Sequence, residues 1–551
     1  MNIIKTILAG SAVLALAMSA NSCTSYLTED LKSSLAPDNT YTSSLGFEVG
    51  TTGLYSIARS EYNTWGEQGA YMHGAACAYE ALQIATDLCD QNGAKDGSLT
   101  PFANLTLNSQ TKFVESYWKW AYNLIGSCNE ILQYSEINTN WDYPTDKALY
   151  QAEARFFRAY AYRTLVYLYG DVPYVDKVQT PFVLDFTRTP KAEVLQHIIE
   201  DFTFAAENLP KDPDAVKTGK LTCWAAYHYL SEMYNLEKEY DDAAEAALKV
   251  INSGYFALNK ERFGNNAKNA GDAFSDMFLV GNQNRTSGNK ESIWVMQFEY
   301  NTVGGGTNSD DWTRRAWNPQ YFNINGFALA DTLGGRGLAQ ISPMKWWVGT
   351  KGTNATGPSV NGIFEDGDMR NSDFSIKRNW YYNNEAETST FGKKCNITDQ
   401  TWASGLLYPA LTKFFFGVSE NLQLTGSYKD RMKIRLAETY LNLAEAYLGK
   451  SDAEKAAEAV NVVRRRAKVS DVDASQIDMD FLLDERIREL AGEESRRFTL
   501  VRTGKYLERV KAHNDAIKDE VQDFHALWPI PQSIIDANRD VVFPQNPGYS
   551  N

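Results

Sequence analysis

Two stretches of the chain, residues 221–251 and 431–468, match each other at a constant offset in the numbering. Each has the apolar periodicity of two helices joined by a short break. The identical positions are Leu230/Leu443, Glu232/Glu445, Tyr234/Tyr447, Ala243/Ala456, Ala244/Ala457, Ala246/Ala459 and Val250/Val463. Alanine-rich helices can match by chance, but seven identities in register favour a true repeat. Small residues at fixed places let antiparallel helices approach closely, so the chain is predicted to use one helical hairpin at least twice.

The rest of the sequence divides into helical and irregular parts. A helix is predicted over Ala148 to Tyr169, ended by Gly170 to Pro173. In residues 256–427 glycine and asparagine become frequent, helical periodicity fades, and a short strand is predicted at Ile293 to Tyr300. The predicted fold class is mainly α. Tetratricopeptide-like hairpins form an α-α superhelix over residues 40–255 and 428–551, with the loop-rich region containing a few short strands.

Tryptophan is concentrated in the loop-rich region. Seven of the 13 tryptophans are Trp294, Trp312, Trp317, Trp346, Trp347, Trp380 and Trp402. With this aromatic content we do not expect disorder, and long ordered loops in compact proteins usually serve a function. We therefore place a ligand there, although core packing explains any single tryptophan at least as well.

The N-terminus has the features of an export signal. Lys5 supplies the positive charge, residues 7–18 form an apolar run, and small or polar residues lead to Cys23. The run is too short to span a bilayer as a stop-transfer helix. Residues 1–22 are therefore predicted to be a lipoprotein signal peptide, with Cys23 acylated and holding the protein on a membrane. A plain secretory signal cleaved nearby is the alternative.

Charge and metal-binding patterns exclude several classes of function. The net charge of −15 argues against a protein that binds the phosphate backbone of nucleic acids or a polybasic membrane binder. The five histidines form no i, i+4 pair, and no cofactor is expected. Residues 365–368 offer oxygen ligands for a structural Ca²⁺, but a turn held by Asp368 and Arg370 is the simpler interpretation. The five cysteines after Cys23 are predicted to be small buried residues, although a Cys77–Cys89 pair is an alternative.

Arginine and glutamate gather between residues 485 and 497. Such a cluster could suggest an active site. On a helix, however, spacings of three and four residues make ion pairs along its surface the simpler interpretation. The cluster comprises Glu485, Arg486, Arg488, Glu489, Glu493, Glu494, Arg496 and Arg497.

Several segments together resemble the SusD/RagB family of outer-membrane nutrient-binding lipoproteins of Bacteroidetes. They are EARFFRAYAYRTLVYLYGDVPYV (153–175), RLAETYLNLAEAYL (435–448), AVNVVRRRA (459–467), LLDERIRELAGEESRRFTLVRTGK (482–505) and LWPIPQSIIDANRDVVFPQNPGY (527–549). The resemblance implies one SusD-like domain over residues 23–551. It also implies a surface lipoprotein anchored at Cys23 in the outer membrane. This lipoprotein would capture oligosaccharide or polysaccharide and deliver it to a SusC-like TonB-dependent transporter.

A glycan site needs aromatic platforms for the apolar faces of sugar rings, and short polar side chains for their hydroxyls. Two stretches supply both, one within residues 62–110 and the other within residues 300–347. The candidate ligand-binding residues are Trp65, Tyr71, Asn92, Phe102, Asn104, Trp312, Trp317, Tyr321 and Trp346. Among these we expect Trp312 and Trp317, with Trp65 or Phe102, to line the site.

Three alternatives stay open. A RagB-like member of the family would bind peptide. A glycoside hydrolase needs only two carboxylates at a suitable distance, which 69 acidic residues cannot exclude. No GxSxG, Walker A, HExxH or dinucleotide-binding motif occurs, and the family resemblance implies binding without catalysis. Finally, helical hairpins can bind protein partners on a concave face. We assign that face to the transporter.

Overall fold

The computed structural model describes residues 37–62, 72–73, 76–91, 97–179, 183–302, 311–416 and 420–550. Its main helices are α3 (Ser44–Arg59), α5 (Lys112–Ile137), α6 (Asp146–Tyr169), α7 (Lys191–Asn208), α8 (Cys223–Glu237), α9 (Tyr240–Ile251), α14 (Leu436–Gly449), α15 (Ala453–Arg466), α16 (Met479–Leu490), α17 (Arg496–Arg502) and α18 (Tyr506–His513). Shorter ones are α2 (Pro37–Thr40), α4 (Thr100–Ala103), α10 (Ala273–Asp276), α11 (Thr313–Trp317), α12 (Lys345–Val348), α13 (Asp399–Ala403) and α19 (Gln532–Ala537). The predicted mainly α fold is confirmed.

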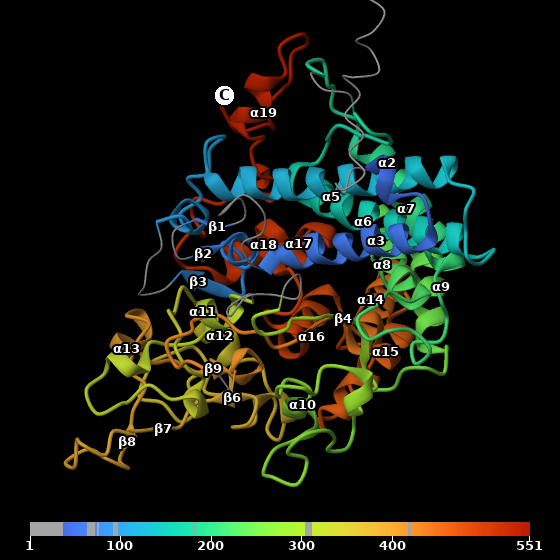
Figure 1. Cartoon of the computed structure of the whole chain (residues 1–551). Coiled ribbons are helices and arrows are strands. Elements are labelled where there is room, and N and C mark those ends of the chain that lie inside the picture. The colour runs from blue at the N-terminus through green and yellow to red at the C-terminus, as the bar shows by residue number, and fades with distance from the viewer. Residues whose placement is uncertain are drawn as a thin grey trace, which may run out of the picture.

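The helices stack in chain order. From α5 to α9 each packs against the next, and α9 then contacts α14, which packs on α15 and α16 (Figure 1). Helix α6 is buried around most of its circumference, because α5 and α7 cover two of its faces and α17 also contacts it. It ends as predicted at Gly170, whose φ of 71° suits glycine. Helix α9 buries one stripe of small residues, including Ala243, Ala247 and Val250. None of the helices in the described part of the chain is long and apolar enough to cross a membrane.

The predicted repeat corresponds to the hairpins α8–α9 and α14–α15. Their equivalent glutamates, Glu232 and Glu445, are both buried and both bind Arg502 of α17, at 3.3 Å and 2.7 Å. Arg163 of α6 contacts Glu232 from another side, at 2.8 Å. Burial opposes ionisation, but Arg163 and Arg502 lower the pKa of Glu232 to about 2. Glu232 and Glu445 therefore hold α17 against the helical stack through their ion pairs with Arg502.

The strands among the described residues are short, and several of them lie outside residues 256–427. These join in antiparallel pairs: β1 (Met72–His73) with β2 (Ala76–Cys77), β3 (Cys89–Gln91) with β5 (Ile341–Pro343), β4 (Ser292–Met296) with β10 (Arg431–Arg435), β6 (Ile376–Lys377) with β9 (Ala410–Leu411), and β7 (Trp380–Tyr381) with β8 (Lys394–Cys395). The strand predicted at 293–300 is present over Ser292–Met296 and does not extend to residue 300. The prediction that 431–468 is wholly helical was wrong at its start, because β10 pairs with β4 before α14 begins.

Most tryptophans of the loop-rich region lie in its core. Trp294, Trp317, Trp347, Trp380 and Trp402 are at most 5% exposed. Trp317 stacks on Phe414 with centroids 5.2 Å apart, and Trp347 donates its Nε1–H to the carbonyl of Leu88 at 2.6 Å. A region with little regular structure has few apolar faces, so large rings supply its core.

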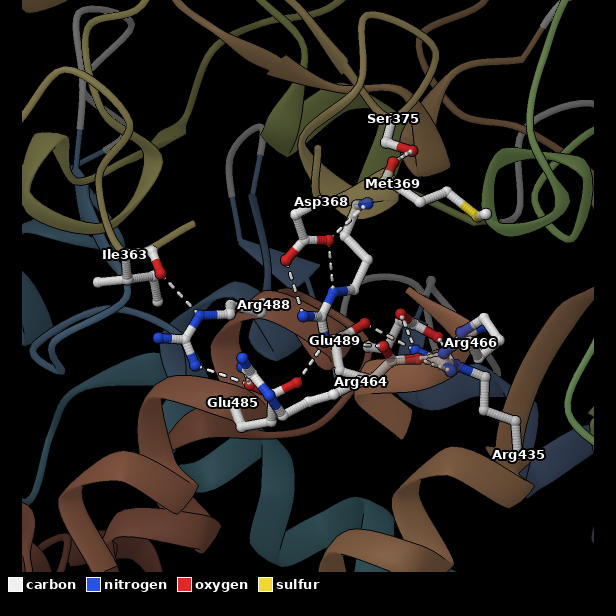
Figure 2. A network of polar contacts seen from close by, with 12 residues as sticks. Ile363, Asp368, Met369, Ser375, Arg435, Arg464, Arg466, Glu485, Arg488 and Glu489 are labelled. Atoms are coloured by element: carbon white, nitrogen blue, oxygen red, sulfur yellow. Dashed lines mark hydrogen bonds and ion pairs between the residues drawn. The ribbon is translucent and has the colours of Figure 1, made fainter. Parts of the chain in front are cut away.

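A buried ionic network fastens the loop-rich region to the helices (Figure 2). It consists of Asp368, Arg370, Arg435, Arg464, Arg466, Glu485, Arg488 and Glu489. Arg370 comes from the loops and binds Asp368 beside it and Glu485 of α16, at 2.7 Å and 2.6 Å. Figure 2 shows the other arginines at two glutamates of α16. Arg464 binds Glu485, whereas Arg466 and Arg435 bind Glu489. Burial opposes ionisation, but the arginines lower the pKa of Glu485 to about 2.

The network corrects one prediction and confirms another. Ion pairs along a single helix account for Glu485 with Arg488, but Arg370, Arg435, Arg464 and Arg466 reach Glu485 and Glu489 from other elements. The predicted turn is present, with Asp368 accepting from the backbone N–H of Arg370 at 2.9 Å. Cys89, Cys128, Cys223 and Cys395 are free and buried, so Cys89 does not form the alternative disulfide.

Candidate functional site

The antiparallel pair β3–β5 brings together the two stretches predicted to form the site. Asp90 lies opposite Ser342, and Gln91 lies opposite Ile341. Beside this pair is a cavity of about 580 Å³, within the usual range for small-molecule sites. Its walls come from β3, α4, β5, α12, α13 and the end of α18. Segments from near the two ends of the sequence and from its middle thus meet at one site.

Aromatic side chains form part of the cavity wall. The indole of Trp346 stacks on the imidazole of His513, with centroids 3.8 Å apart and planes 19° from parallel. Trp402 of α13 also lines the cavity. Burial is the main cause that lowers the pKa of His513, so this ring is neutral near pH 7.

The polar lining consists of an amide and several charged groups. Asn104 is exposed at the end of α4. Lys345 and Asp399 form an ion pair at 2.5 Å. Asp90 and Asp515 add two more carboxylates. Desolvation in the cavity, reinforced by the charge of Asp515, raises the pKa of Asp90 to about 6.

Buried contacts beneath the cavity hold Trp346 in place. Its Nε1–H donates to the carbonyl of Asp87 at 2.7 Å. The carboxylate of Asp87 is bound by Arg496 at 2.7 Å and by Arg509 at 2.8 Å. Burial opposes ionisation of Asp87, but the two guanidinium groups hold its pKa below the ordinary value. The aromatic wall is therefore set by the C-terminal helices rather than by a free loop.

Of the predicted ligand-binding residues that the structure describes, Asn104 and Trp346 line this cavity. Trp65, Tyr71, Asn92 and Cys23 lie outside the described residues. Trp312 does not line the cavity; its ring packs half-buried under the guanidinium of Arg315, 4.0 Å from the centroid.

Three further predictions of ligand contact were wrong. Phe102 is 1% exposed and packs edge-on against Trp528, with centroids 4.9 Å apart. Trp317 stacks on Phe414, as described above. Tyr321 is fully buried and donates its hydroxyl to the carbonyl of Ala330 at 2.8 Å. In each case the ring serves the apolar core, which the sequence pattern of loops could not distinguish from a ligand platform.

The sequence interpretation also missed residues that line the cavity. They are Asp90, Lys345, Asp399, Trp402, His513 and Asp515. Asp90 and Lys345 lie within the residue ranges of the two predicted stretches but were not among the candidates. No sequence signal joins α13 or the end of α18 to those stretches, because long-range packing alone brings them there. Within the described ranges no three carboxylate, histidine or cysteine side chains gather closely enough to hold a metal ion.

Comparison with protein families gives two matches. A family model described as "SusD family" matches residues 290–549, and one described as "Starch-binding associating with outer membrane" matches residues 66–235. Two curated relatives are from Formosa agariphila. SusD-like protein P25 is 25% identical over 556 residues, with 95% of each chain covered. SusD-like protein P2 is 25% identical over 541 residues, with 94% of each chain covered.

Solved structures share the same fold. Surface glycan-binding protein A from Bacteroides thetaiotaomicron, in complex with laminarihexaose, superposes with a TM-score of 0.70 at 18% identity. The alignment covers 92% of this chain and all of that one. A laminarin-binding SusD-like protein gives a TM-score of 0.67 at 20% identity, with 91% of this chain and 99% of that chain covered.

Proposed function

The chain belongs to the SusD family, and on that premise we propose that it is a non-enzymatic protein that captures oligosaccharide or polysaccharide. The observation that carries the proposal is the cavity between β3–β5 and α13, with Trp346, His513 and Trp402 in its wall. Sugar rings have apolar C–H faces that pack on aromatic rings, and hydroxyls that need polar partners at their rim. Asn104 and Asp90 supply such partners at this cavity.

The structural neighbours support the same class of ligand. Two of them are described as binding laminarin or laminarihexaose, both neutral glucans. The second family model carries the words "starch-binding". These descriptions differ in the glycan, so the identity of the sugar for this chain is a matter for a binding panel.

We place the protein at the cell surface, held in the outer membrane by acylated Cys23. The family model that matches residues 66–235 is described as associating with the outer membrane. We assign delivery of the glycan to a SusC-like TonB-dependent transporter, docked on the helical stack. Purification of the acylated protein from native membranes should recover a large outer-membrane barrel with it. A consistently solitary protein would contradict this partnership.

Affinity electrophoresis and calorimetry with a panel of starch, laminarin, fructan and mannan test the proposal. We expect at least one glycan to retard the protein. Trp346→Ala should weaken that binding at least about tenfold, because it removes an aromatic platform of the size that typically contributes about 1–3 kcal/mol. Tyr381→Ala is the matched control, since Tyr381 is 51% exposed in the loop-rich region and does not line the cavity.

Three outcomes would change this assignment. Binding of peptides but of no glycan would favour a RagB-like function. New reducing ends in a glycan incubated with the protein would identify a glycoside hydrolase. Equal binding by the wild type, Trp346→Ala and Tyr381→Ala would move the site away from this cavity.

A further inference from the structure

The charged groups along the cavity wall are not balanced. Lys345 is the cation among the residues that line it, and Asp399 already holds it in an ion pair at 2.5 Å. Asp399 also accepts hydrogen bonds from Thr356, so its charge is fully engaged. Arg509 lies 5.1 Å from the centroid of Trp346, but its guanidinium is bound to Asp87 and Asp484. His513 is neutral near pH 7.

Asp90 therefore leaves negative charge beside the cavity. Asp90 forms no ion pair or hydrogen bond through its side chain among the described residues. Asp515 is 93% exposed, with Lys518 at 2.8 Å as its partner in solvent. The charged neighbour that shifts the pKa of Asp90 is another acid, Asp515, and the shift leaves Asp90 ionised at neutral pH.

We propose that this cavity selects uncharged glycans and rejects those that carry sulfate or carboxylate groups, with Asp90 as the residue that sets this preference. The proposal rests on the function proposed above and narrows its ligand class. An unpaired carboxylate accepts hydrogen bonds from sugar hydroxyls, and these charge-assisted bonds are stronger than neutral ones. The same carboxylate repels an anionic substituent. Asp90 is solvent-exposed beside the cavity, but the effective dielectric constant near a protein surface is still below that of water, so the repulsion acts on an anionic group bound there. The cavity offers no free cation among its described residues to offset it.

Pairs of glycans with the same backbone test the preference. The probes are laminarin with sulfated laminarin, and dextran with dextran sulfate, each measured by affinity electrophoresis and calorimetry at pH 7.5. We expect the wild type to bind the neutral member of at least one pair about tenfold or more tightly than the sulfated member. Asp90→Asn should reduce this ratio at least about threefold, since it removes the charge and keeps the shape. Glu385→Gln, an exposed change of equal charge elsewhere in the loop-rich region, should leave the ratio unchanged.

The pH dependence provides a second measurement, in which the wild type itself loses the charge of Asp90. Sulfate esters stay ionised at pH 5, whereas Asp90 gains a proton below about pH 6. The ratio of neutral to sulfated binding should therefore narrow at pH 5 in the wild type, and change less in Asp90→Asn. Matching melting temperatures would confirm that the variant is folded.

Each outcome decides a different statement. Tighter binding of a sulfated member, or an unchanged ratio in Asp90→Asn, would overturn the charge preference and leave glycan capture standing. Binding of neither member of any pair, nor of any glycan in the panel above, would overturn both the preference and the proposed function.

Discussion

The helical stack and the loop-rich region satisfy their backbone polar groups in different ways. In the stack, hydrogen bonds within each helix do so, and helices next to one another in sequence pack together. In the loop-rich region, side chains take over much of this role. Lys429 donates to the carbonyls of Phe278, Lys413 and Phe415 at 2.7–2.9 Å. Asn318 donates to the carbonyl of Gly334 at 3.0 Å. The amine of Lys429 and the amide of Asn318 thus satisfy carbonyls that regular secondary structure would otherwise pair.

The two regions also differ in how their order can be lost. The stack distributes its stability over many similar contacts between neighbouring helices. The loop-rich region depends on particular side chains, and its attachment depends on the buried ionic network. The predictions below separate these two modes of stabilisation.

The largest effect should come from Glu489→Gln. Glu489 is fully buried and binds Arg435 at 2.5 Å, Arg370 at 3.3 Å, and Arg466. Removing its charge leaves three buried guanidinium groups poorly compensated, which we expect to lower the free energy of unfolding by about 3–5 kcal/mol. In this variant, the urea unfolding transition followed by tryptophan fluorescence should have its midpoint at a lower urea concentration than the transition followed by far-UV circular dichroism. The reason is that seven of 13 tryptophans lie between residues 294 and 402.

The control for this prediction is Glu245→Gln on α9. Its ion pair with Lys249 is exposed and spans one helical turn, so the change should stay within about 0.5 kcal/mol. A loss below about 1 kcal/mol in Glu489→Gln would show that the network contributes little to the attachment of the loops.

A smaller effect is expected from overpacking the stack. Ala243 and Ala456 occupy equivalent positions of the two hairpins and are fully buried. A leucine at either position forces its neighbours apart, which we expect to cost about 1–3 kcal/mol. Because the hairpins are equivalent, Ala243→Leu and Ala456→Leu should have similar costs in thermal or urea unfolding. Glu245→Leu, exposed on α9, is the control. A cost confined to one hairpin would mean that the repeat in sequence is not a repeat in packing.

The scaffold was predictable because its information is local. Helical periodicity predicted α6 from Ala148, close to its observed start at Asp146, and the constant offset between the two matching stretches identified both hairpins. Local pattern failed at 431–435, where the partner strand β4 lies far earlier in the chain, at Ser292–Met296. It could not reveal that Glu232 and Glu445 meet on Arg502, because no pattern within the hairpins encodes α17.

The candidate site was less predictable than the fold. Sequence placed Asn104 and Trp346 in one site, because both lie in loops rich in aromatic and short polar residues. It also placed Trp317, Phe102 and Tyr321 there, although their rings are in the core. A buried ring and a ligand-facing ring look the same in sequence, since both occur among glycine and asparagine. The distinction comes from partners that are distant in the chain, as Phe414 is from Trp317.

The smallest predicted effect concerns Glu438 of α14, a largely buried acid that is 15% exposed and contrasts with Glu489. Its nearest basic neighbours, Arg486 and His228, are each 3.7 Å away, and burial lowers the pKa of His228 to about 3, so this imidazole is neutral. Desolvation, only partly opposed by Arg486, raises the pKa of Glu438 to about 7. The folded state therefore binds this proton more tightly than the unfolded chain, in which the carboxyl has its ordinary pKa. The contribution of this carboxyl to the free energy of unfolding is therefore fully present below its ordinary pKa, and it is lost as the pH rises toward 7.

Glu438→Gln keeps the shape of the protonated carboxyl and cannot titrate. Between pH 5 and pH 7.5 the wild type should lose on the order of 1 kcal/mol more unfolding free energy than this variant. Urea unfolding at the two pH values measures the difference. Parallel pH profiles would show that the carboxyl is ionised and compensated in the folded state, as Glu489 is. A divergence would show that the stack tolerates a poorly paired acid, whereas the attachment of the loops requires each acid to be bound by several arginines.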